Sequence, residues 1–174
     1  RVKSFGNIHQ HLDLIAGLPY EDVNSFQKSF DDVYAMRPDQ LQLGFLKVLK
    51  GSGMREDAPG YGINWHERAP YEVLTTDWLS YGDVLLLKGV EDMVEVYYNS
   101  RQFDRTISKI MERYASPFLF FKELADFYDR EGLAGIGHAR IARYEILRRF
   151  LSEEKGWELK EYEQCMVLDL YARE

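Results

Sequence analysis

The chain is short of cysteine, since its 174 residues contain only Cys165. One thiol cannot form an intramolecular disulfide, which excludes a disulfide-stapled scaffold. Cys165 falls between Tyr162 and Met166 in a helical pattern, where a buried, unreactive thiol is expected. This cysteine usage fits a reducing compartment, and we expect a cytoplasmic protein.

An excess of positive charge and long apolar runs are also lacking. The formal net charge is −7 and the sequence pI is about 5.2, which argues against a nucleic-acid-binding surface because such a surface needs a basic face. No apolar run approaches the roughly 20 residues that span a bilayer, and no signal peptide opens the chain. We therefore expect neither nucleic acid nor membrane as a partner. The first residue is Arg1, so we expect the chain to begin inside a longer protein.

What the chain does have is apolar and aromatic content. Hydrophobic residues make up 45% and aromatic residues 14%, which is enough for a packed core. The length predicts one domain, or one domain and a fraction of a second.

The first fifty residues predict a strand, a helix and a second strand. An apolar run at 12–16 breaks at a glycine and a proline, as a buried strand does before a tight turn. Apolar residues at helical spacing then occupy 23–34, and a second apolar, alternating run spans 41–49. Two strands joined by one helix are expected to be parallel.

Residues 53–79 show no clear period and contain many glycine, proline and aromatic residues. We expect an ordered connection with one short strand near 71–74. Two interpretations of its large aromatic residues stay open: a core that bridges the two halves, or a cap that contacts substrate. These residues are Tyr61, Trp65, Tyr71 and Trp78.

From residue 80 onward the pattern is helical. Ser80 and Asp83 resemble a capping box, and Pro117 is well placed in the first turn of a helix. Five helices are expected, over about 80–98, 103–114, 117–129, 138–151 and 158–172. The fold class is therefore α+β and mainly α, with a β-α-β segment at 1–52, a connection at 53–79 and a helical domain at 80–174.

One stretch also resembles a known family. Asp13-Leu14-Ile15-x-Gly17-Leu18-Pro19-x-Glu21 resembles the DLIxGLPGET-type strand and turn late in the partial β/α barrel of radical S-adenosylmethionine (SAM) enzymes. The sequence HQHLDLIAGLPYED, followed by RPDQLQLGFLKVLKGS, is most similar to the branch of this family that has an N-terminal cobalamin-binding domain. Residues 70–100 resemble the opening of that branch's C-terminal region, whose function is unassigned.

The resemblance implies a SAM pocket at the ends of these two strands. It implies that Ile15 packs on the adenine and that the backbone near Phe45–Lys47 reads the edge of the base. The turn residues Gly17, Pro19 and Glu21 are carried over with them, and Tyr20 replaces the family's usual glycine. The residues assigned to cofactor binding are thus Ile15, Gly17, Pro19, Glu21, Phe45 and Lys47. An alternative interpretation is that the glycine and the proline only make a tight turn.

The chain departs from the family in one decisive respect. Radical SAM chemistry needs a CxxxCxxC loop whose thiolates hold a four-iron–four-sulfur cluster, and this sequence has none. We therefore expect a C-terminal fragment of an oxidoreductase or methyltransferase that is inert alone, with the cluster, SAM and cobalamin bound only in the full-length protein. Its expected partners are the remainder of its own polypeptide and, in isolation, further copies of itself.

Two other function classes compete with this one. A helical protein-interaction module without enzymatic activity is the alternative. A hydrolase is disfavoured because no nucleophile–base pair is visible. His9, His11 and Asp13 alternate along the first strand and so could form a metal site, but exposed polar residues explain them equally well, and we assign no metal ligand and no catalytic residue.

Overall fold

The computed structural model describes residues 6–172, which divide into two compact units. Unit 1 ends at Glu91 and unit 2 begins at Asp92. The helices dominate and the strands are few and short, which confirms the predicted α+β, mainly α class. The expected segments 1–52, 53–79 and 80–174 divide the chain differently and remain a prediction.

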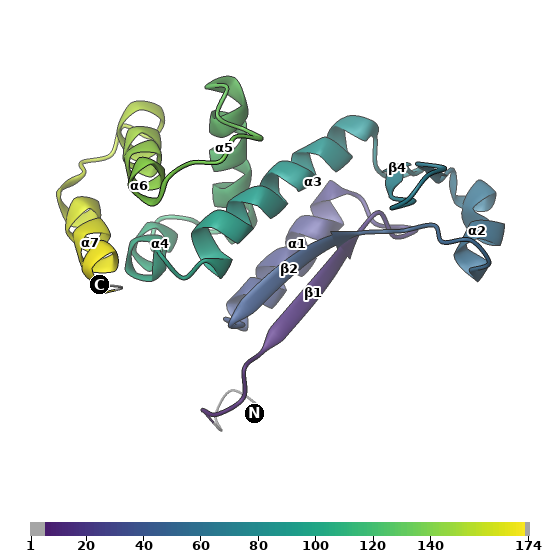
Figure 1. Ribbon diagram of the computed structural model, residues 1–174, viewed down its shortest axis with the longest axis horizontal. Coiled ribbons are helices and arrows are strands. Elements are labelled where there is room, and N and C mark those ends of the chain that lie inside the picture. Colours follow the sequence, from purple (N-terminus) through teal and green to yellow (C-terminus); the bar gives the residue numbers. More distant parts are fainter. Residues whose placement is uncertain (1–5, 173–174) are drawn as a thin grey trace. The chain divides into compact units, whose positions relative to one another are not determined.

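Unit 1 opens with the predicted β-α-β segment (Figure 1). Strand β1 (His11–Ala16) and strand β2 (Gln40–Phe45) are parallel, and Leu12 pairs with Leu41. Helix α1 (Val23–Ala35) connects them. It begins at Asp22, whose carboxylate accepts a hydrogen bond from the Ser25 amide at 2.8 Å.

The two faces of this sheet differ. Leu41, Leu43 and Phe45 are buried on one face, toward which α1 contributes the buried Phe26 and Phe30. The opposite face carries the exposed side chains of His11, Asp13, Ile15 and Gln42. Alternation along each strand therefore separates a covered apolar face from an open, largely polar one.

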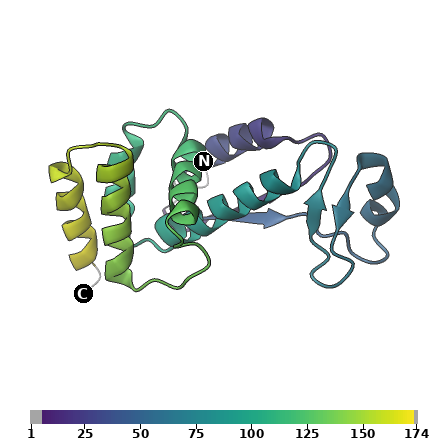
Figure 2. The ribbon, with the colours of Figure 1, turned by 90° about the horizontal axis from the view of Figure 1, so that it is seen from above.

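The connection forms more structure than its sequence predicted. Helix α2 (Gly53–Asp57) and a 3₁₀ turn at Ala58–Tyr61 precede a two-stranded antiparallel ribbon, β3 (Asn64–Trp65) and β4 (Val73–Thr75). The ribbon and α2 lie beyond the carboxyl ends of β1 and β2 (Figures 1 and 2). The second strand was predicted to continue to residue 49 but ends at Phe45, because the Leu46 carbonyl accepts from the Val73 amide at 2.9 Å and the chain joins β4 instead.

All five helices predicted after residue 79 are present. Helix α3 (Tyr81–Val94) begins at the predicted capping box, in which the Asp83 amide donates to Ser80 Oγ at 3.1 Å and the Ser80 amide donates to Asp83 at 2.8 Å. It continues into a π-helical turn, Glu95–Asn99. The others are α4 (Asp104–Met111), α5 (Pro117–Arg130), α6 (Arg140–Arg149, extended by a π-helical turn at Phe150–Glu154) and α7 (Lys160–Tyr171).

Unit 2 is held by a buried carboxylate as well as by an aromatic core. Asp169 of α7 is 4% exposed and accepts hydrogen bonds from the amides of Arg105 and Thr106, at 3.1 and 2.8 Å. The Thr106 hydroxyl also donates to it at 2.8 Å. Asp169 therefore caps the first turn of α4 from another helix. No helix between residues 6 and 172 is long and apolar enough to cross a membrane.

Candidate functional site

The turn after β1 is the best-defined part of the site predicted from sequence. Gly17 has a φ of 89°, a conformation that favours glycine, and it lies against β4. A Cβ at this position would stand 2.7 Å from Val73 Cγ1. Glycine is thus required both by the turn and by the close approach of β4.

Ile15 and Glu21 flank this turn in contrasting environments. Ile15 lies on the open face of the sheet and is 48% exposed, so an apolar surface is available at the carboxyl end of β1. Glu21 and Pro19 are half-buried. Partial burial, and then the neighbouring Asp22 carboxylate, raise the pKa of Glu21 above its usual value.

The strand end at Phe45–Lys47 is more occupied. The Phe45 side chain is buried on the covered face, and the Lys88 ammonium lies 4.4 Å from its ring centre. The Leu46 amide donates to the Ala16 carbonyl at 2.9 Å, and the Lys47 carbonyl accepts from Leu49 at 3.0 Å. Those backbone groups are engaged within the chain, so the roles assigned to Phe45 and Lys47 remain predictions.

Lys88 itself was missed by the sequence analysis. It forms an ion pair with Glu72, whose side chain is 20% exposed, in addition to its contact with Phe45. The two charges are 16 residues apart and belong to no periodic pattern, so no sequence signal pointed to the pair.

An aromatic cluster stands beside the turn. Tyr20 is 74% exposed, and its φ of 68° is uncommon for a residue with a side chain. Its ring centre lies 5.8 Å from that of Tyr61 and 4.7 Å from that of Trp78. Tyr61 and Trp78 therefore form a wall next to Tyr20, and substrate contact by this wall remains a prediction.

The two histidines near the start of β1 contact different carboxylates. His11 Nε2 lies 2.9 Å from Asp13, whereas His9 Nδ1 lies 4.0 Å from Asp39. Within residues 6–172 no group of three or more His, Cys, Asp or Glu residues is arranged to hold a metal ion.

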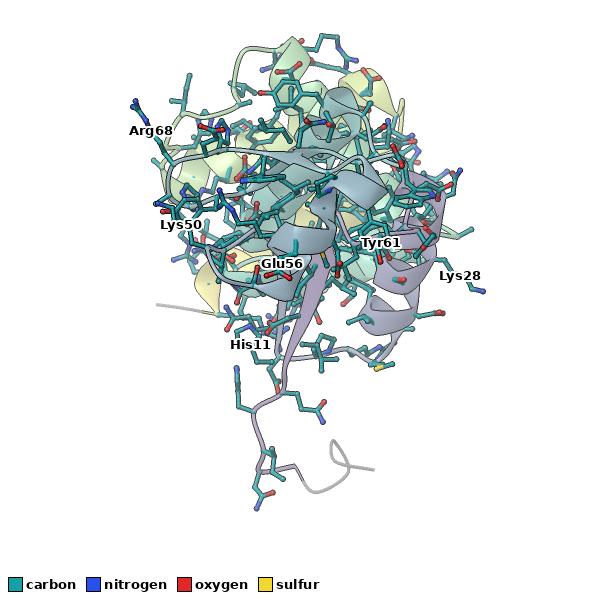
Figure 3. The ribbon with its side chains drawn as sticks, turned by 90° about the vertical axis from the view of Figure 1, so that its right-hand side faces the viewer. His11, Lys28, Lys50, Glu56, Tyr61 and Arg68 are labelled. Atoms are coloured by element: carbon teal, nitrogen blue, oxygen red, sulfur yellow. The ribbon has the colours of Figure 1, made fainter. Side chains whose placement is uncertain are left out.

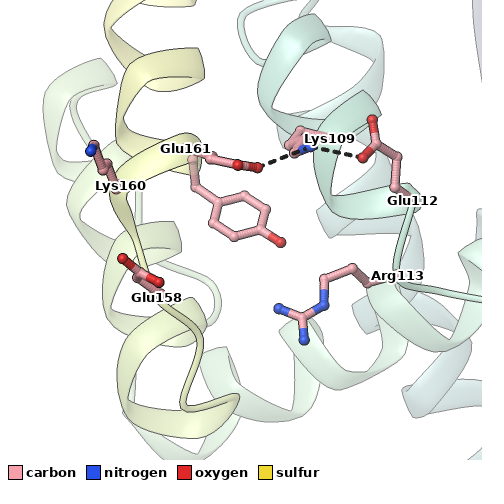
Figure 4. Close-up of a pocket in the computed structure, with 7 residues that line it drawn as sticks. Lys109, Glu112, Arg113, Glu158, Lys160 and Glu161 are labelled. Carbon is pink, nitrogen blue, oxygen red and sulfur yellow. Dashed lines mark hydrogen bonds and ion pairs between the residues drawn. The ribbon is translucent and has the colours of Figure 1, made fainter.

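A cleft of about 340 Å³ lies in unit 2 between α4 and the start of α7 (Figure 4). Lys109 bridges Glu112 and Glu161 at 2.9 and 3.0 Å, and these bonds raise its pKa. Arg113 projects into the cleft and stacks on Trp157 at 4.2 Å. The acidic and basic side chains that line the cleft balance one another, so it is an ion-paired seam between helices and is not selective for either charge.

Comparison with known proteins identifies one family. Residues 59–174 match the model of a family described as a protein of unknown function, DUF4080. The chain belongs to the DUF4080 family. No curated protein and no solved structure matches it. The DUF4080 match covers all of unit 2, and it also covers β3, β4 and the part of α3 that belongs to unit 1.

Proposed function

We propose that this DUF4080 chain is the C-terminal part of a radical SAM iron–sulfur enzyme, an oxidoreductase or methyltransferase with a cobalamin-binding domain. In that enzyme β1 and β2 are the last strands of a partial β/α barrel, and the helical region covers the active site. The resemblance of residues 9–52 supports this assignment, and membership of a family of unknown function leaves it open.

The observation that carries the proposal is the free edge of β1. The carbonyls of Gln10 and Ala16 accept hydrogen bonds from the amides of Gln40 and Leu46, at 3.1 and 2.9 Å. The backbone N–H and C=O groups of the even-numbered residues therefore point toward β2. Alternation then directs the backbone groups of His11, Asp13 and Ile15 to the other edge, where no strand from residues 6–172 pairs. Parallel sheets are normally larger and covered on both faces, so this edge fits a preceding barrel strand.

The residues present do not fit the cluster itself. Cys165 is alone on α7, and burial raises the pKa of its thiol, which disfavours the thiolate that iron requires. Ile15 does offer an exposed apolar surface at the strand end, as adenine packing requires. The chain therefore contributes binding surface, and its catalytic inertness in isolation is part of the proposal.

The test is to express the complete reading frame under anaerobic conditions. A CxxxCxxC loop encoded before Arg1, a cluster absorbance and cleavage of SAM are expected, while residues 1–174 alone give neither signal. A start codon immediately before Arg1 would refute the proposal.

In the isolated chain, the free edge of β1 is expected to pair with the same edge of a second copy. Unpaired strand edges tend to pair with other strands. At this edge the available backbone N–H and C=O groups belong to the odd-numbered residues of β1. Antiparallel pairing about Leu12 sets His11 of one copy opposite Asp13 of the other, whereas pairing about Asp13 sets two carboxylates together. We infer the first register for the pair.

A helical interaction module remains the alternative function. Val167, Leu168 and Tyr171 expose apolar surface on α7, and a shallow groove of about 550 Å³ lies along the same helix. This alternative predicts that residues 1–174 are a complete, monomeric protein, and sedimentation of that chain separates the two.

A further inference from the structure

Two buried hydrogen-bond donors at the carboxyl end of the sheet lack an acceptor. Arg55 Nη1 of α2 and Trp65 Nε1 of β3 are shielded from solvent, and neither has a hydrogen-bond partner among the described residues. They belong to side chains in contact, since the Arg55 guanidinium lies 5.4 Å from the Trp65 ring centre. Buried donors are nearly always satisfied, so two unsatisfied donors on contacting side chains point to an acceptor that residues 6–172 do not supply.

Three basic residues between positions 50 and 68 also lack an acidic partner in the described part of the chain. Lys50 lies 5.8 Å from the Tyr71 ring centre, and Trp65 pairs with Val73 of β4. No ion pair to a carboxylate is formed by Lys50, Arg55 or Arg68 within residues 6–172. Lys50 and Arg68 project on the same side of unit 1, and Lys28 of α1 lies on the other (Figure 3). In a protein with a net charge of −7, the three cations between positions 50 and 68 thus have no carboxylate partner among the described residues.

The location is informative as well. Val73, the partner of Trp65 in the ribbon, packs against Gly17 at the end of β1. In open α/β sheets, ligands bind outside the carboxyl ends of the strands. Arg55 and Trp65 belong to α2 and β3, which lie beyond the carboxyl ends of β1 and β2 and so on the side of the site assigned above.

We propose that Arg55 and Trp65 bind an anionic group, a carboxylate or a phosphate, of the ligand at this strand end. The location of that ligand rests on the proposed function. A guanidinium presents paired donors that match either oxyanion, and the indole N–H adds a third. The substrate class is then an acid or a phosphate ester.

The experiment titrates the chain with inorganic phosphate and, separately, with succinate, against chloride at equal ionic strength, and follows binding by calorimetry. Saturable binding is expected, and the tighter anion names the group. Arg55→Gln should weaken it at least about tenfold and Trp65→Phe, which keeps the ring but loses the N–H, about fivefold. Arg68→Gln is the matched control, with the same charge change and an effect under about twofold.

Equal weakening by Arg55→Gln and Arg68→Gln would overturn the site in favour of diffuse charge attraction. Absence of saturable binding would overturn it in favour of a buried water. Thermal melting of each variant verifies folding. Neither readout needs a cluster or SAM, so loss of this site leaves the radical SAM assignment intact, and a start codon before Arg1 refutes that assignment without affecting anion binding.

Discussion

The two units treat polar and charged groups differently. Unit 2 joins about half of its described lysines and arginines to carboxylates on other elements, such as Arg149 to Glu131 at 2.6 Å and Lys155 to Glu123 at 2.9 Å. Among the described residues, unit 1 leaves a strand edge unpaired and a sheet face open, and Lys50, Arg55 and Arg68 form no ion pair with a carboxylate. Ion pairs between helices are typical of a self-contained helical domain. Unit 1 instead retains the surfaces that a further partner or ligand would use.

The largest effect is expected from removing the buried carboxylate of unit 2. Asp169→Ala leaves the amides of Arg105 and Thr106 buried without an acceptor, and we expect a loss of about 3 kcal/mol in the free energy of unfolding. Urea denaturation measures it. Asp169→Asn keeps one acceptor oxygen and should lose less, and equal losses for the two variants would contradict the capping role.

The next effect concerns the turn of unit 1. Gly17→Ala combines a positive φ with a Cβ only 2.7 Å from Val73, and we expect a loss of about 2 kcal/mol. Gly51→Ala is the control, because Gly51 also has a positive φ, of 78°, but has nothing within 4 Å of the added methyl. A similar loss at both positions, measured by thermal melting, would mean that contact with β4 adds nothing.

The open edge predicts association that one proline should abolish. The Asp13 amide is directed away from β2, so Asp13→Pro removes an edge donor without removing a β1–β2 bond. We expect the dimer dissociation constant to rise about tenfold or more, as read by sedimentation equilibrium. Leu14→Pro is the contrast, since it removes a bond to β2 and should unfold unit 1. A parent chain that stays monomeric at high concentration would contradict the inference.

Local patterns predicted most of the elements, and the non-local contacts were the parts they could not reach. The capping box at Ser80 and Asp83 and the parallel direction of the first two strands were predicted from spacing and from the helix that joins them, whereas the register that pairs Leu12 with Leu41 was not. The early end of β2 depends on Val73, 27 positions after Leu46, and the cap on α4 depends on Asp169, 63 positions after Thr106. The pairing of Arg55 with Trp65 arises in the same way, because α2 and β3 were read together as one irregular connection.

The smallest effect is a pH dependence at the turn. The pKa of Glu21 is raised in the folded state, so its contribution to stability is full below its unfolded value of 4.5 and is lost as the pH rises through the folded value. Glu21→Gln should therefore gain about 1–3 °C in melting temperature relative to the parent between pH 4 and pH 7. Asp22→Asn is a control of opposite sign, since the hydrogen bonds from Ser25 lower the pKa of Asp22 and its contribution is lost as the pH falls below 3.8. A Glu21→Gln difference that does not change with pH would show that this carboxyl is solvated like an exposed one, and the turn would then lack the partial burial expected of a ligand-facing surface.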